Sequence, residues 1–194
     1  MSDTPTRPTV LLVDGYSLIF RGFHALPLLS SNGVYTNAIQ GFFSMLFKAL
    51  ADYRPDGLCV MMDAHAPTFR HTIYEEYKGT RKPMPEELRP QLPLARQFLA
   101  AMGVKMFEME GYEADDLLGT AARMAGERGR DAYILTGDRD SLQLVGGHTK
   151  VILTKTGISE NLLLDADKVL ETYGYTPAQA TDMKGLMGDS SGSA

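Results

Sequence analysis

The sequence of 194 residues contains one cysteine and no tryptophan. A single cysteine cannot form an intramolecular disulfide, and Cys59 lies within the apolar run GLCVMMD, where we expect it to be buried as a small hydrophobic residue. The sequence also lacks a run of about 18 apolar residues and an N-terminal charged segment followed by an apolar stretch. We therefore expect a soluble, cytoplasmic, monomeric protein with no membrane-spanning segment.

An excess of basic residues is also missing, because 19 Lys and Arg stand against 24 Asp and Glu, for a net charge of -5. Proteins that bind phosphates usually carry a basic face, so the net charge alone argues against nucleic acid. The sequence has no internal repeat and no long run of like charge, and no low-complexity tract occurs before the final SSGSA. The distribution of the charges along the chain therefore matters more than their sum.

Apolar periodicity predicts short buried strands that alternate with amphipathic helices. This alternation is typical of an α/β domain with a largely parallel central sheet and helices on both faces. Asn37 is expected to cap the first of these helices. The predicted strands lie within residues 8–15, 56–63, 104–109, 131–138 and 149–154. The predicted helices lie within residues 37–53, 91–103, 113–129, 165–174 and 176–188.

Acidic residues gather where the predicted strands end. In open parallel sheets, ligands bind outside the carboxyl ends of the strands, so separate segments would deliver these side chains to one edge. A further acid, in LMGDSS near the C-terminus, would join them. The set comprises Asp14, Asp63, Glu113, Asp115, Asp116, Asp138, Asp140 and Asp189.

Each acidic motif alone has an ordinary structural explanation. Acids in the first turn of a helix complement its dipole, and Asp and Gly favour turns. Converging carboxylates, however, raise one another's pKa unless a cation neutralises them, and oxygen ligands suit Mg²⁺ or Mn²⁺. Setting these eight aside from the 24 Asp and Glu leaves 16 against 19 Lys and Arg, a balance of +3 that is compatible with a polyanionic substrate.

The connection over residues 64–90 is unusually long for an α/β domain. It interleaves basic residues with aromatic ones, which would supply cations for phosphates and flat faces on which bases stack. It also contains four glutamates, so a solvated surface of mixed charge remains an alternative. The basic residues are Arg70, Lys78, Arg81 and Lys82, and the aromatic ones are Phe69, Tyr74 and Tyr77.

These motifs resemble the 5′-nuclease domain found at the N-terminus of bacterial DNA polymerase I and in related flap endonucleases. The resemblance runs in family order through LLVDGYSLIFRGFHAL, MMDAHAPTFRHTIYEEYKGTRKPMPEEL, GYEADDLLGTAA, TGDRDSLQL and LMGDSS. It implies a PIN-like α/β fold and a metal-dependent 5′→3′ exonuclease and 5′-flap endonuclease. It also implies DNA with 5′ ends or 5′ flaps as the substrate, and a polymerase domain in a longer parent chain.

The resemblance implies a role for each site residue. The eight acids would bind two Mg²⁺ or Mn²⁺ ions, with Asp138, Asp140 and Asp189 on the second side. Lys78 and Arg81 would reach the scissile phosphate from a helical arch over the site, formed by about residues 64–90. Tyr77 would stack on a terminal base, and Arg70 and Lys82 would contact the nucleic acid.

The sequence departs from the family pattern at its C-terminal end. Residues 1–189 are expected to form the nuclease domain, and residues 190–194 a tail that is a linker or an artificial addition. Gly192 stands where the family has a further metal-binding Asp, and the helix-hairpin-helix clamp on duplex DNA is absent. Impaired activity is therefore expected.

Two other functions remain open from the residues alone. One is a ribonuclease of the wider PIN class, because the sequence does not reveal how the sugar is discriminated. The other is a nucleic-acid-binding remnant without activity. An aspartyl phosphatase is disfavoured because Tyr16 replaces the second Asp of its motif, and a dinucleotide-binding enzyme is disfavoured because G-x-G-x-x-G is missing.

Overall fold

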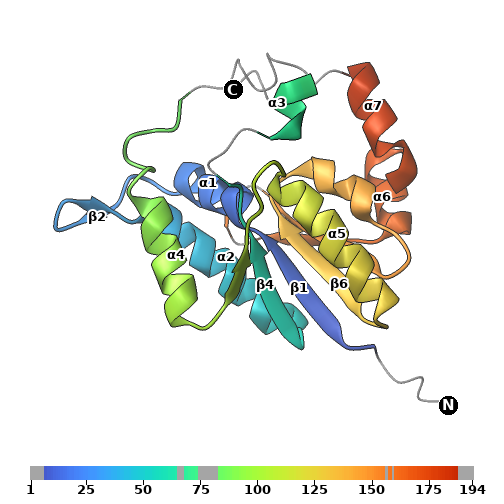
Figure 1. The fold of residues 1–194 in the computed structure, drawn as a ribbon, viewed down its shortest axis with the longest axis horizontal. Coiled ribbons are helices and arrows are strands. Elements are labelled where there is room, and N and C mark those ends of the chain that lie inside the picture. The colour runs from blue at the N-terminus through green and yellow to red at the C-terminus, as the bar shows by residue number, and fades with distance from the viewer. Residues whose placement is uncertain (1–6, 65–67, 74–82, 156, 159, 188–194) are drawn as a thin grey trace.

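The computed structural model describes residues 7–64, 68–73, 83–155, 157–158 and 160–187, which are built around a six-stranded sheet (Figure 1). Its strand order is β5-β4-β1-β6-β7-β8, and every neighbouring pair is parallel except β7 and β8. The strands are β1 (Thr9–Asp14), β4 (Gly57–Met61), β5 (Lys105–Phe107), β6 (Asp131–Thr136), β7 (Thr149–Thr154) and β8 (Asn161–Leu164). A separate short hairpin pairs β2 (Ser30–Ser31) with β3 (Val34–Tyr35).

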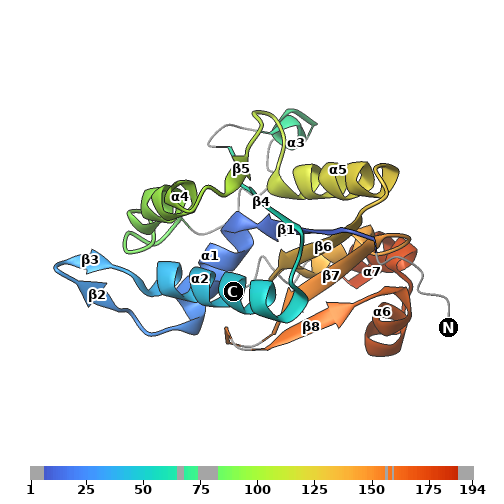
Figure 2. The same ribbon diagram turned by 90° about the horizontal axis from the view of Figure 1, so that it is seen from below.

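Helices cover both faces of the sheet. Helices α1 and α2 lie on one face and α5 lies on the other, as Figure 2 shows. The α-helices are α1 (Gly15–Ala25), α2 (Asn37–Tyr53), α3 (Phe69–Ile73), α4 (Gln91–Ala101), α5 (Ala114–Glu127), α6 (Ala166–Tyr173) and α7 (Ala180–Met187). Two 3₁₀ helices, η1 (Arg139–Leu144) and η2 (Pro177–Gln179), complete the described elements.

The central strand β1 is buried on both of its faces. Leu11 and Val13 belong to the apolar cluster formed with α1, α2 and α4, whereas Leu12 belongs to the cluster formed with α5. This division follows from the alternation of side chains along a strand. Burial on both faces explains why β1 is an almost continuous apolar run rather than an alternating one.

Two glycines allow α1 and α2 to pack closely. A Cβ atom on Gly22 would lie 2.7 Å from the carbonyl oxygen of Ala38, and one on Gly41 would lie 2.4 Å from the Cα of Gly22. Any larger side chain at either position would force the helices apart. The contact fixes α1, and with it the direction in which the chain leaves β1.

The α/β fold predicted from the sequence is confirmed, and each predicted strand and helix has a counterpart. Helix α1, the hairpin and β8 were not predicted from the apolar pattern. The predicted cap of α2 is wrong, because Thr36 is the N-cap and Asn37 is the first helical residue. Asn37 is buried instead, where its amide donates to the carbonyl of Phe23 and accepts from Gln91.

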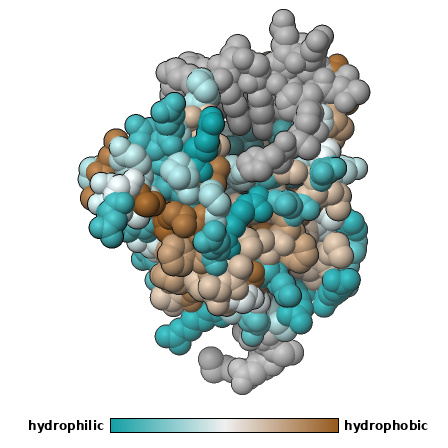
Figure 3. Space-filling view, turned by 60° about the vertical axis from the view of Figure 1, so that its left-hand side comes forward, coloured by the Kyte–Doolittle hydropathy of each residue, from teal (hydrophilic) through white to brown (hydrophobic). Residues whose placement is uncertain are grey.

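Apolar side chains remain on the surface beside the hydrophilic ones. Figure 3 shows hydrophobic residues across the middle of one face, with hydrophilic residues around them. Exposed large apolar side chains occur on several elements, including Phe47 on α2, Phe98 on α4 and Phe107 on β5. Among the described residues, no helix is both long and apolar enough to cross a membrane.

Candidate active site

Asp14 anchors the candidate site at the carboxyl end of β1. It is the last residue of the strand and also the N-cap of α1, where its Oδ1 accepts a 3.1 Å hydrogen bond from the Ser17 backbone N–H. Its Oδ2 accepts a 2.8 Å bond from the Thr136 hydroxyl at the end of β6. Only 5% of Asp14 is exposed, so its carboxylate is held in one orientation by two donors.

The acids of GYEADD converge on Asp14 from the start of α5. Glu113 is the N-cap and Asp116 is the third helical residue, and each side chain accepts from the backbone N–H of the other in a capping box. Asp63, which follows β4, accepts a 2.7 Å bond from the Ala114 backbone N–H and so joins this helix end. Asp115 lies between these caps in the first turn.

The acids of TGDRD follow β6 in the same manner. Asp138 is the N-cap of η1 and accepts a 2.9 Å bond from the Asp140 backbone N–H. The Asp140 carboxylate pairs with Lys184 of α7. The start of α5 and the helix α3 lie at the same end of the molecule in Figure 1.

Burial and mutual repulsion make two of these carboxylates hard to ionise. Burial, together with the negative charges of Asp115 and Asp63, raises the pKa of Asp14 to about 7 against the opposing hydrogen bonds from Ser17 and Thr136. Burial also raises the pKa of Asp115 to about 6. The other acids that raise the pKa of Asp115 are Asp138, Asp140, Asp63 and Glu113. Asp115 is therefore the electrostatic centre of the cluster.

Arg70 of α3 meets the cluster from the side of the long connection. Its guanidinium makes two hydrogen bonds to Asp116, of 2.7 and 2.8 Å, and lies 3.8 Å from Glu113. It also lies over the Phe69 ring, which contacts Tyr112 at a centroid distance of 5.8 Å. Phe69 and Tyr112 are both exposed, so a cation and two aromatic faces stand beside the acids.

The donor set fits a hard divalent cation in its chemistry. The cluster offers carboxylate oxygens from several segments, and the pKa values, raised by burial and by mutual repulsion, reflect a cost that a cation would relieve. Within the described ranges, however, no three His, Cys, Asp or Glu side chains are arranged so that they could hold an ion. The assignment of metal ligands therefore stays a prediction that rests on proximity and chemistry.

The structure brings five predicted acids close to Asp115 and places Arg70 beside them, on Asp116. Asp116 itself is turned toward Arg70 and the capping box. The remaining predicted site residues lie outside the described part of the chain. They are Tyr77, Lys78, Arg81, Lys82 and Asp189.

Sequence reasoning missed the residues that hold the acids in place. Thr136 bonds Asp14, and Lys184 pairs with Asp140 from a helix that follows 44 residues later. Ser17 accepts a 3.0 Å bond from the Gly137 backbone N–H and so connects α1 to the end of β6. The position of Ser17 three residues after Asp14 is a capping signal that could have been found.

We predict that the metal-free protein loses stability as the pH rises from about 4 to 7. Unfolded aspartate releases its proton near the ordinary pKa of 3.8, whereas folded Asp14 and Asp115 retain theirs until about 7 and 6. Between these pKa values the folded state binds more protons than the unfolded state. Raising the pH through this window therefore lowers the free energy of unfolding. Melting temperatures measured in chelator across the window should fall by several degrees.

The control for this pH dependence is Asp115→Asn, which removes one of the two titrating groups. The melting temperature of this variant should fall less steeply over the same pH range. Parallel curves for the two proteins would contradict a raised pKa at Asp115.

The cysteine is not part of this chemistry, because burial raises the pKa of Cys59 to about 11 and keeps the thiol protonated.

Comparisons with known proteins identify the family of the chain. The sequence model of the 5′-3′ exonuclease N-terminal, resolvase-like domain matches residues 9–174. DNA polymerase I of Bacillus subtilis is 46% identical over 186 residues, which cover 95% of this chain and 21% of that protein. DNA polymerase I of Chloroflexus aurantiacus is 45% identical over 190 residues, covering 95% and 20%. The chain thus spans about one fifth of the length of these relatives.

A solved structure shares the fold. The D15 flap endonuclease of bacteriophage T5, crystallised as a pseudo-enzyme-product complex with DNA and metal ions, superposes with a TM-score of 0.70. The match covers 93% of this chain and 66% of that protein, at 20% sequence identity. At this identity the likeness concerns the PIN-like fold, namely a mostly parallel sheet enclosed by helices.

Proposed function

Because the chain belongs to the 5′-3′ exonuclease family, with the N-terminal resolvase-like domain over residues 9–174, we propose that it hydrolyses DNA phosphodiester bonds at 5′ ends and 5′ flaps. The observation that carries the proposal is the convergence of carboxylates from β1, β4, α5 and η1 around Asp115. Their charge would be tolerable at neutral pH only with bound cations, and such sites serve phosphate chemistry.

Two Mg²⁺ or Mn²⁺ ions would be held by the acids. Bound there, the ions would supply a more acidic water and stabilise charge on the phosphate oxygens. Asp138, Asp140 and Asp189 would serve the second ion. The first would be held by Asp14, Asp63, Glu113, Asp115 and Asp116.

The described residues would orient the acids before a substrate arrives. Thr136 and the Ser17 N–H fix both oxygens of Asp14, while the Ala114 N–H holds one oxygen of Asp63. Such preorganisation lowers the cost of arranging ligands during the reaction. Arg70, already beside Asp116, would meet a phosphate bound at the acids.

The substrate would be DNA with a free 5′ end or a 5′ flap, bound by a monomer. Relatives about five times longer than this chain are polymerases, so we propose a polymerase domain as its partner in a parent chain. Residues 1–189 would form the nuclease domain, with residues 64–90 as an arch over the site. Tyr77, Lys78, Arg81 and Lys82 would contact the DNA from this segment.

The decisive experiment is incubation of the chain with labelled 5′-flap DNA and with RNA of the same sequence, each in Mg²⁺, Mn²⁺ or chelator. We expect metal-dependent cleavage of the DNA near the flap junction. Cleavage of RNA alone would favour a ribonuclease of the PIN class. Binding without cleavage, in any metal, would support a remnant that has lost activity.

We predict that Lys78→Ala lowers cleavage of the 5′-flap substrate by about tenfold or more, because it removes a cation proposed to meet the scissile phosphate. Since Lys78 is not among the proposed metal ligands, stabilisation by Mn²⁺ should stay unchanged. Cleavage rates and melting curves on the same preparations test both statements. Normal cleavage by the variant would refute the proposed contact, whereas loss of Mn²⁺ stabilisation would point to damage in the acid cluster.

A further inference from the structure

A cavity of about 480 Å³ lies beside the start of α4, separate from the acid cluster. Two arginines and three apolar residues line it: Met84, Arg89, Leu92, Pro93 and Arg96. Its volume falls in the range of about 300–1,000 Å³ that is usual for sites of small ligands. Met84 and Arg89 lie at the end of the segment proposed as the arch, and none of the five residues is a proposed metal ligand or DNA contact.

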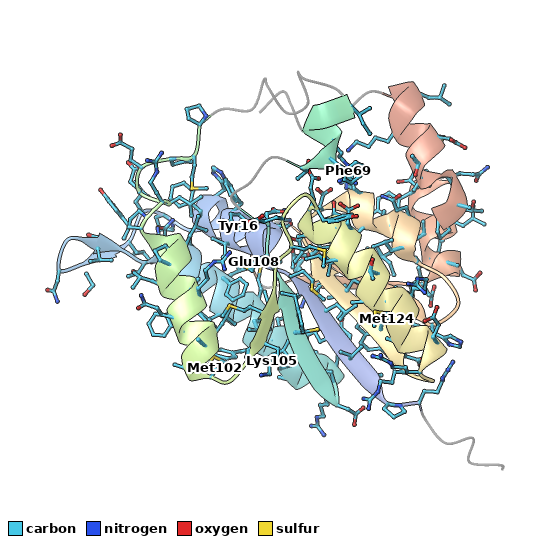
Figure 4. The ribbon with its side chains drawn as sticks, in the orientation of Figure 1. Tyr16, Phe69, Met102, Lys105, Glu108 and Met124 are labelled. Carbon is cyan, nitrogen blue, oxygen red and sulfur yellow. The ribbon has the colours of Figure 1, made fainter. Side chains whose placement is uncertain are left out.

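A chain of contacts joins the cavity to the acids. The charges of Arg96 and Asp63 both act on the Tyr16 hydroxyl, and Tyr16 follows Asp14 by two residues. The pKa of Tyr16 is raised chiefly by burial, and Arg96 opposes the rise while the charges of Asp63 and Glu108 add to it. Figure 4 shows Tyr16 and Glu108 toward the same end of the sheet as Phe69, with Lys105 and Met102 toward the other end.

The lining suits an anion that also has an apolar part. Arg96 is anchored by a 2.6 Å bond from one terminal nitrogen to Glu108, which fixes its direction and leaves further N–H groups. Arg89 is exposed, and no ion pair joins it to another residue in the part of the chain that the structure describes. Met84, Leu92 and Pro93 provide the apolar wall.

We propose that this cavity binds one nucleotide of the single strand that carries the 5′ end. Arg89 and Arg96 would hold its phosphate, and the apolar wall would pack against its base or sugar. The inference rests on the proposed function, because the nearness of the cavity to the acids is what favours DNA over other anions. The phosphate would be either the terminal 5′-phosphate or an internal phosphodiester of the strand.

The test measures binding of a short fluorescent single-stranded DNA to the 194-residue chain in chelator, between about 50 and 200 mM salt. Arg89→Gln should weaken binding by about fivefold or more, and should reduce the slope of log K against log salt by about 0.7 for one lost phosphate contact. Arg130→Gln is the matched control. It removes an exposed arginine just before β6, at the amino ends of the parallel strands and so at the end opposite the acids. It should leave the affinity and the salt slope unchanged.

Each DNA is used with a 5′-phosphate and with a 5′-hydroxyl. A defect confined to the phosphorylated DNA would assign the cavity to the terminal phosphate, whereas an equal defect with both would assign it to an internal one. Binding by Arg89→Gln that matches the control in affinity and slope would overturn the proposal. Because binding is measured in chelator, where no cleavage occurs, a failure of the proposed nuclease activity would not change this binding result. A failure of the binding prediction would likewise not refute the proposed nuclease activity.

Discussion

Saturating Mn²⁺ or Mg²⁺ is expected to raise the melting temperature of the chain by about 5–10 °C at pH 8. A ligand that binds only the folded state at one hundred times its dissociation constant adds about 2.7 kcal/mol, and a kcal/mol shifts the melting temperature of a protein of this size by about 2–4 °C. The ion also removes the repulsion that raises the pKa of Asp14 and Asp115. Calorimetry or dye-based melting in metal and in chelator measures the shift.

Ionic strength must be separated from specific binding in this measurement. Potassium chloride at the same ionic strength screens exposed charges but acts weakly on a buried cluster, so it should reproduce little of the shift. The gain should also shrink near pH 5, where Asp14 and Asp115 hold protons that compete with the ion. An equal effect of potassium and Mn²⁺ would show that the acids do not form a metal site.

The core of the fold could be predicted because its strands are buried on both faces. Runs such as TVLLVD and DAYILT leave few alternatives to a parallel sheet with helices on either side. Helix α1 was missed because GYSLIFRGFHA mixes aromatic residues and glycine. Its Gly22, which lowers helix propensity, is explained only by the close contact with α2.

Strand β8 was missed for a different reason. Its four residues NLLL carry too short a pattern to show a period, and they pair antiparallel to β7 at the edge of the sheet. The pattern of apolar residues in a segment this short does not separate a strand from a turn of helix. Only the pairing with β7 defines the element.

The positions of the acids could be predicted, but their partners could not. Strand ends in a parallel sheet meet at one edge, so Asp14, Asp63 and Asp138 were expected together from their place in the sequence. The pairs of Arg70 with Asp116 and Lys184 with Asp140 join residues that are 46 and 44 positions apart. Such pairs depend on how α3 and α7 pack, which no local pattern encodes.

The largest effect on activity is expected from Asp115→Asn, which should lower cleavage of 5′-flap DNA by about 100-fold or more. Asp115 feels the charge of five other carboxylates, so its removal takes the central charge from the proposed metal site. The same change removes a buried charge and its repulsion with the neighbouring carboxylates. The metal-free variant should therefore melt at a higher temperature than the parent at pH 8. Its stabilisation by Mn²⁺ should be correspondingly smaller.

A higher metal-free melting temperature combined with slower cleavage distinguishes this role from simple damage to the fold, which would lower both stability and activity. Asp167→Asn is the matched control, because Asp167 is an exposed acid in the first turn of α6. It should leave cleavage and the Mn²⁺ shift unchanged and lower stability slightly through the helix dipole. If Asp115→Asn cleaves as fast as Asp167→Asn, the carboxylates around Asp115 do not carry the reaction. If it is inactive but less stable than the parent without metal, Asp115 supports the fold rather than a cation site.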